Sequence, residues 1–214
     1  MISERVNSIA QILITAGVKA IVVACNTATV YAIDQLRKNV LIPIIGVEPA
    51  IKPAAKQSVS KKVAVLTTQA TSENASFKAL IKQHSEGVQV FIQPCPGLVE
   101  FIENGLQNSD KCTNLLKQYI KPLVGVGVDT IVLGCTHYPF VEQQIRAIVG
   151  KEVAIIETAH PVTQQLIHRL VELNLTAQTD QQGKLFCFSS QPTMQQEKLF
   201  NELMQTQLTI HKLN

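Results

Sequence analysis

Apolar positions along the chain follow two spacings, one typical of buried strands and one typical of amphipathic helices. Near the N-terminus, Ile2, Val6, Ile9 and Leu13 share one face of a helix that ends at Gly17. Further along, short apolar runs bounded by turn residues alternate with longer stretches at helical spacing. Strands that alternate with helices predict an α/β fold with a mainly parallel sheet and helices on both faces.

This pattern predicts seven strands and a helix after most of them. The strands are expected at residues 19–24, 42–47, 62–66, 88–92, 130–134, 153–156 and 185–188. The helices are expected at residues 27–38, 50–57, 109–124, 140–149, 161–173 and 193–204. A further helix is expected from a cap region at 71–73 to Gln83, a short one ends at Glu103, and residues 176–183 are expected to form a polar loop.

Two of the predicted strands have nearly the same sequence. Residues 17–27 read GVKAIVVACNT and residues 127–137 read GVDTIVLGCTH, so Cys25 and Cys135 occupy matching positions at strand ends. Ligands of open α/β sheets bind outside the carboxyl ends of the strands. A duplicated unit of this kind predicts two thiols on opposite walls of one cleft. Two acid/base groups on opposite sides of a substrate suit a reaction that inverts a carbon centre by moving one proton.

Composition and charge exclude several other classes of protein. The chain has 214 residues, 46% of them hydrophobic and 16% charged, which is typical of one large or two small globular domains. The net charge of +3 is scattered and Trp is absent, so no nucleic-acid partner is expected. The longest apolar run, residues 40–47, is far shorter than the roughly 20 residues of a membrane span. The polar N-terminus does not resemble a signal peptide.

The cysteines and motifs suggest cytoplasmic chemistry without a cofactor. The chain has five cysteines and no Cys-x-x-Cys pair, which disfavours both a disulfide framework and a zinc site. It also lacks the glycine-rich motifs that hold nucleotides or flavins. We therefore expect a cytoplasmic protein with no metal and no cofactor.

The residues around the two matched thiols are suited to acid/base chemistry and to binding a carboxylate. Each cysteine precedes a predicted helix, whose N-terminus is expected to lower the thiol pKa. The side chains that follow them are Asn26, Thr27, Thr136 and His137. The alternative interpretation is that each cysteine is a small buried apolar residue. The matched contexts favour chemistry for this pair, whereas Cys95, between two prolines, is better explained as buried filler.

Two further groups are candidates from their positions. Glu103, at a helix end, is placed to assist His137 or a thiol, with a solvated carboxylate as the equal alternative. Thr67, Thr68 and Thr71 follow a predicted strand, where hydroxyl groups commonly meet a ligand.

The segments Ala24–Ala28 and Leu133–Pro139 resemble the two cysteine motifs of the glutamate racemase family. Residues 46–50, 64–68 and 95–99 are similar to further family stretches, so the resemblance covers essentially the whole chain. His137 separates this chain from the related aspartate racemases, which usually have an acidic residue there. The resemblance implies cofactor-independent interconversion of L- and D-glutamate, which supplies D-glutamate for bacterial peptidoglycan.

The resemblance also implies roles and a domain organisation. Cys25 and Cys135 would be the two bases, and one set of residues would contact the substrate: Asn26, Thr27, Thr71, Thr136 and His137. Glu103 would be a supporting acid. Two pseudo-symmetric α/β domains would enclose the site, the first formed by residues 1–48 and 158–214 and the second by residues 49–157.

The chain departs from the family pattern in two places. The family usually begins with a strand ending in Asp-Ser-Gly, followed later by a Tyr-Gly pair, and this chain opens at the next helix. Residues 157–159 read Glu-Thr-Ala where Asp-Ser-Gly is more common. We therefore expect lowered racemase activity and an open edge of the first sheet that favours a homodimer. A racemase of another amino acid, a glutamate-binding or regulatory descendant, and a purely structural domain are the alternatives.

Overall fold

The computed structural model describes residues 1–178 and 181–213, so part of the predicted loop 176–183 and the last residue of segment 158–214 lie outside the described residues. The strands are β1 Ile21–Val23, β2 Ile44–Gly46, β3 Lys62–Thr67, β4 Gln89–Pro94, β5 Thr130–Leu133, β6 Ala154–Ile156, β7 Cys187–Ser189 and β8 Ile210–Lys212. The helices are α1 Ile2–Thr15, α2 Asn26–Asn39, α3 Ile51–Gln57, α4 Gln69–Glu73, α5 Ala75–His84, α6 Leu98–Glu103, α7 Asp110–Gly125, α8 Glu142–Val149, α9 Ala159–Glu172 and α10 Met194–Met204. A 3₁₀ turn, Tyr138–Val141, precedes α8.

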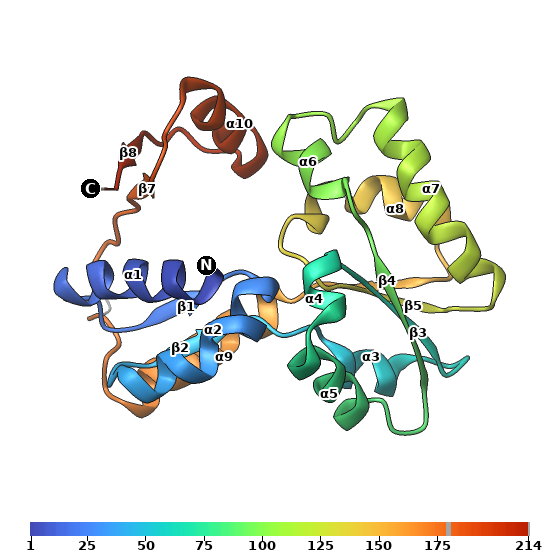
Figure 1. Ribbon diagram of the computed structural model, residues 1–214, viewed down its shortest axis with the longest axis horizontal. Helices are drawn as coiled ribbons and strands as arrows, with labels where there is room; N and C mark the ends of the chain where they lie inside the picture. Colours follow the sequence, from blue (N-terminus) through green and yellow to red (C-terminus); the bar gives the residue numbers. More distant parts are fainter. Residues whose placement is uncertain (179–180, 214) are drawn as a thin grey trace.

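The main sheet has the order β4-β3-β5-β6, and its three strand pairs are parallel. Side chains alternate across β3, so that Val63 and Val65 pack on one face while Ala64 and Leu66 pack on the other. The first face is covered by α3 and α5, and the second by α6, α7 and α8 (Figure 1). Burial on both faces explains why β3 and β5 are almost wholly apolar. The predicted parallel α/β architecture is confirmed.

A second, smaller sheet pairs β1 and β2 in parallel. Its core contains Ala10 of α1 together with Ile33 and Leu36 of α2, packed against Ile21 and Val23. Figure 1 shows α1 and α2 with these two strands in one half of the molecule and the four-stranded sheet in the other. The segment that carries Cys25 follows the carboxyl end of β1 in the smaller sheet, and the segment that carries Cys135 follows the carboxyl end of β5 in the main sheet.

Residues after α9 form a third unit. Strands β7 and β8 pair in parallel and α10 connects them, beginning with a capping box between Thr193 and Gln196. Figure 1 shows α10 near α6, and Leu203 of α10 packs against the core cluster of the main sheet. Strand β8 was not predicted, because its three residues are too few to establish an alternating pattern.

The predicted helix cap at residues 71–73 was wrong. The hydroxyl of Thr68 caps α4 by accepting the N–H of Thr71, and α4 ends at Glu73. The side chain of Asn74 then caps α5 by accepting the N–H groups of Ser76 and Phe77. Two capped helices therefore replace the single predicted one, and this brings the Thr68 and Thr71 side chains together.

None of the described helices is long and apolar enough to cross a membrane.

Candidate active site

Cys25 lies where β1 passes into α2. It is the N-cap residue of α2, and its Sγ accepts the backbone N–H of Ala28 at 3.4 Å. The side chain is exposed. The sulfur therefore lies at the positive end of a helix dipole and within reach of a ligand.

Cys135 lies directly after β5 and is buried, with 7% of its surface exposed. Burial raises the pKa of its thiol to about 11, although backbone N–H groups of His137 and Tyr138 act in the opposite direction. The expectation that a helix N-terminus lowers this pKa was wrong. Only a short 3₁₀ turn follows the cysteine, and the loss of solvation outweighs its N–H groups.

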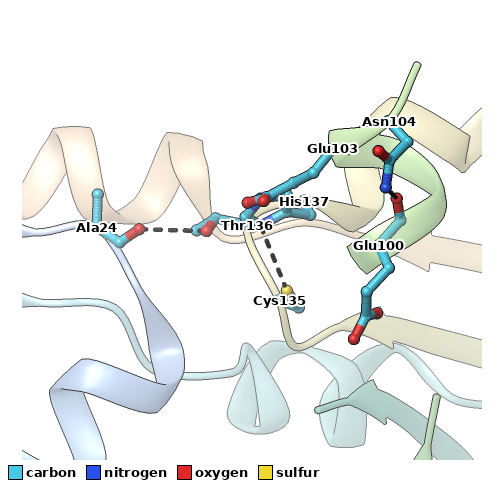
Figure 2. A network of polar contacts seen from close by, with 7 residues as sticks. All are labelled: Ala24, Glu100, Glu103, Asn104, Cys135, Thr136 and His137. Atoms are coloured by element: carbon cyan, nitrogen blue, oxygen red, sulfur yellow. Dashed lines mark hydrogen bonds and ion pairs between the residues drawn. The ribbon is translucent and has the colours of Figure 1, made fainter. Parts of the chain in front are cut away.

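The two strand ends that carry the cysteines meet. The hydroxyl of Thr136 donates to the carbonyl of Ala24 at 3.2 Å, which joins the residue after Cys135 to the residue before Cys25 (Figure 2). Burial is the main cause of the raised pKa of Cys135, and a negative charge on Cys25 acts in the same direction. The Thr136–Ala24 hydrogen bond brings the two cysteine-bearing strand ends side by side.

A histidine and a carboxylate lie next to Cys135. The Nδ1 atom of His137 lies 3.9 Å from the Cys135 sulfur, and its Nε2 lies 3.0 Å from a carboxylate oxygen of Glu103 at the end of α6 (Figure 2). The Glu103 side chain is 64% exposed and the His137 side chain 35%. The imidazole of His137 therefore lies between the Glu103 carboxylate and the Cys135 thiol.

Three hydroxyl groups form a cluster across the two halves of the molecule. Thr27 Oγ1 on α2 lies 2.8 Å from Thr71 Oγ1 and 3.0 Å from Thr68 Oγ1, and the latter two are also 3.0 Å apart. Thr68 was a candidate from its position after the predicted strand, together with Thr67 and Thr71, but it was not among the substrate contacts that the family resemblance implied.

Two buried polar atoms close to the strand ends have no hydrogen-bond partner among the described residues. Asn26 donates from Nδ2 to the Val47 carbonyl at 3.3 Å, while its Oδ1 is unpartnered. Thr67 Oγ1 at the end of β3 is also unpartnered. Leaving a buried polar atom unpaired costs roughly 1–3 kcal/mol, so such an atom favours a ligand that pairs with it.

A cavity of about 260 Å³ lies beside the paired strand ends. Its lining includes Ala24, Val47, Thr136 and Glu157. A larger cavity of about 750 Å³ lies along β2 between the end of α2 and α9, and its lining contains none of the predicted site residues. Of the predicted site residues, only Thr136 lines the smaller cavity, so neither of these two cavities encloses both thiols. Within residues 1–178 and 181–213, no three His, Cys, Asp or Glu side chains are grouped as metal ligands.

The fold and site define a class of protein: a parallel α/β enzyme with two cysteines at adjoining strand ends. The chain belongs to the Asp/Glu/hydantoin racemase family, whose sequence pattern matches residues 3–166. Members of this family are isomerases. This confirms the family that the two cysteine motifs resemble.

Known relatives agree with this assignment. Glutamate racemase of Herpetosiphon aurantiacus is 44% identical over 184 residues, covering 86% of this chain and 71% of the relative. Glutamate racemase isoform RacE1 of Bacillus anthracis superposes with a TM-score of 0.89 at 27% identity, covering 100% of this chain and 80% of that one. Escherichia coli glutamate racemase, solved with L-glutamate and the activator UDP-MurNAc-Ala, gives a TM-score of 0.83 at 25% identity, covering 99% and 80%.

The structural matches confirm the predicted fold of two α/β domains. The boundaries at residues 48 and 157 and the roles of the individual site residues stay predictions.

Proposed function

We propose that the chain interconverts L- and D-glutamate, with Cys25 and Cys135 as the two acid/base groups. The observation that carries this proposal is the meeting of the two strand ends at the Thr136–Ala24 hydrogen bond, one with each thiol. Glutamate racemases that match this chain along most of its length support the choice of substrate.

The proposed reaction moves one proton in and one proton out at the α-carbon. The thiolate of one cysteine takes the α-proton, so the Cα–H bond breaks and an S–H bond forms. The thiol of the other cysteine donates its proton to the opposite face, so its S–H bond breaks and a new Cα–H bond forms. The cysteines exchange protonation states and no electron is gained or lost. Each positioned acid/base group contributes roughly 10²–10⁴-fold to the rate.

The two thiols begin from different environments. Burial raises the pKa of Cys135, so this group rests as a thiol and serves first as the proton donor. Cys25 is exposed and accepts a backbone N–H at the start of α2, and we assign it to serve first as the base. For the opposite enantiomer, Cys135 must lose its proton, and we assign His137, 3.9 Å from its sulfur, to assist that step.

The polar groups around the thiols would hold the ammonium group and one carboxylate of glutamate. We assign the unpartnered Asn26 Oδ1 to the substrate ammonium group, because an acceptor must meet a donor. The hydroxyls of Thr27, Thr68 and Thr71 would donate to a carboxylate, each exchanging a bond to a neighbouring hydroxyl for one to a charged oxygen. Thr136 would contact the substrate from the other strand end.

The resemblance also supports a setting for this reaction. We propose that the D-glutamate serves peptidoglycan synthesis, that the enzyme acts in the bacterial cytoplasm without metal or cofactor, and that two copies associate as a homodimer. Light scattering after size-exclusion chromatography tests the dimer. Activity that persists in a chelator, from protein without absorbance beyond its aromatic band, is expected if no cofactor takes part.

The test of the proposed reaction uses the single variants Cys25→Ala and Cys135→Ala. Circular dichroism should show that the wild type racemises both glutamate enantiomers and that each variant does not. In heavy water, each variant should exchange the α-proton of one enantiomer, a different one for each variant, because one base remains on one face. Racemisation by either variant would contradict the two-base mechanism.

A panel of other amino acids decides between the alternatives. Turnover of a different amino acid but not of glutamate would indicate a related racemase. Glutamate binding without turnover would indicate a descendant that binds or regulates. Either result would replace the proposed function.

A further inference from the structure

Tyr138 is a fully buried aromatic residue that the proposed reaction does not use. It lies in the large core cluster together with Cys95 and Cys135, and its surface is 0% exposed. Its hydroxyl donates to the carbonyl of Thr67, at the end of β3, at 3.1 Å. Burial raises the pKa of this hydroxyl far above its ordinary value, so it remains a donor across the pH range in which the protein is studied.

The turn that carries Cys135 is attached to β3 on both sides of the cysteine. Before it, the backbone N–H of Gly134 donates to the Leu66 carbonyl at 2.8 Å. After it, Tyr138 donates its backbone N–H to the Cys135 carbonyl at 3.1 Å and its hydroxyl to Thr67. The first attachment is made by backbone alone, whereas the second depends on one side-chain oxygen.

The first attachment leaves little room for movement. A Cβ added at Gly134 would lie 2.7 Å from the Leu66 oxygen, so the chain passes too close to β3 for a side chain. The Thr67 carbonyl also accepts the N–H of Cys95 at 2.9 Å, which fixes this acceptor against a second loop. The Tyr138 hydroxyl therefore bonds to a fixed point of the main sheet.

We infer that Tyr138 is a positioning residue, whose hydroxyl holds the Cys135 thiol at the proton-transfer distance from the substrate α-carbon. This inference rests on the proposed function, because it assigns to Cys135 one of the two proton transfers. Small displacements of a reacting group are costly, about 100-fold for 1 Å. Loss of the hydroxyl should impair the transfer at Cys135 and leave the transfer at Cys25 unchanged.

The test is Tyr138→Phe, which keeps the ring and removes only the hydroxyl. Tyr119→Phe is the matched control, because Tyr119 in the same half of the molecule also donates to a carbonyl, that of Pro96 at 2.8 Å. Both variants and the wild type are checked for folding by circular dichroism. Each is then assayed with L- and D-glutamate, unlabelled and deuterated at the α-carbon.

Deuterium isotope effects on kcat/KM separate the two transfers. We expect kcat/KM of Tyr138→Phe to fall about tenfold, and equally in both directions because the equilibrium constant of racemisation is one. The isotope effect should rise for the enantiomer whose α-proton goes to Cys135, which is the one that Cys135→Ala cannot exchange. It should fall for the other enantiomer, since removal of that proton is no longer rate-limiting. Tyr119→Phe should resemble the wild type.

A purely structural role would lower the rate without separating the two isotope effects. A folded Tyr138→Phe with isotope effects like those of Tyr119→Phe would overturn the inference alone. Failure of Tyr138→Phe to fold, while Tyr119→Phe folds, would also overturn it, because the hydroxyl would then maintain the fold rather than position the thiol. Absence of racemisation by the wild type would overturn the proposed function and this inference with it.

Discussion

At the scale of single residues, Glu103 illustrates how an exposed charge can act through a neighbour. Its carboxylate lies 3.0 Å from His137 Nε2, and the other ring nitrogen faces the Cys135 sulfur. Exposed ion pairs contribute little to stability, about 0–1 kcal/mol, so the pair is better explained by what it does to the imidazole. A carboxylate at Nε2 holds the orientation of the ring, and with it the position of the nitrogen that faces the Cys135 sulfur.

We therefore expect Glu103→Gln to reduce kcat/KM several-fold while leaving the free energy of unfolding within about 0.5 kcal/mol of the wild type. Glu100→Gln is the matched control, because Glu100 lies on the same helix and its carboxylate points away from His137 (Figure 2). Steady-state racemisation with both enantiomers and urea unfolding measure the two quantities. Equal activity of the two variants would exclude a role for Glu103 in proton transfer.

At the scale of elements, Asp129 holds the end of the main sheet that lies opposite the site. Its carboxylate accepts the Ser58 hydroxyl at 2.6 Å and the backbone N–H groups of Val59 and Ser60 at 2.8 and 2.6 Å. Burial acts to raise the pKa of Asp129, but these bonds and one from Thr130 outweigh it and lower the pKa to about 2. The loop before β3 is thereby joined to the start of β5.

Because the pKa of Asp129 is lowered in the folded protein, the free energy of unfolding depends on pH. The charged form adds about 2 kcal/mol of stability above pH 4, and this contribution is lost as the pH falls from about 4 to 2. We expect Asp129→Asn to lower the free energy of unfolding by about 2 kcal/mol at pH 7 and by much less near pH 2.5. Urea unfolding at both pH values, with exposed Asp34→Asn as control, measures this. A difference that does not depend on pH would contradict it.

The sequence predicted those helices and strands whose position is determined by the local pattern of apolar and polar residues. The apolar runs of β3 and β5 and the repeated cysteine segments indicated a parallel sheet and its site, because burial on both faces leaves a signal in the sequence. The cap at Asn74 was missed because a helix ends at Glu73 within a stretch that reads as continuous. The raised pKa of Cys135 was missed because burial depends on packing from α6 to α8, which the local motif does not contain.

At the scale of the whole molecule, the two sheets are connected by hydroxyl contacts from α2. Thr27 bonds to Thr68 and Thr71, and the Tyr31 hydroxyl donates to the Ala70 carbonyl at 3.3 Å. Both contacts join α2 to α4. Only the Thr27 cluster also belongs to the proposed site. Variants of Thr27 and Tyr31 can therefore distinguish loss of a contact between the two halves from loss of a contact with substrate.

We expect Thr27→Val to raise KM for both glutamate enantiomers about tenfold, since one hydrogen bond to a charged group is worth about 1.5–3 kcal/mol. Tyr31→Phe removes the other α2–α4 contact, at an exposed side chain, and should leave KM within about twofold of the wild type. Initial rates over a range of glutamate concentrations give KM for each variant. A similar rise in KM for both variants would mean that the link between the two halves controls substrate affinity, and that the Thr27 hydroxyl does not bind glutamate directly.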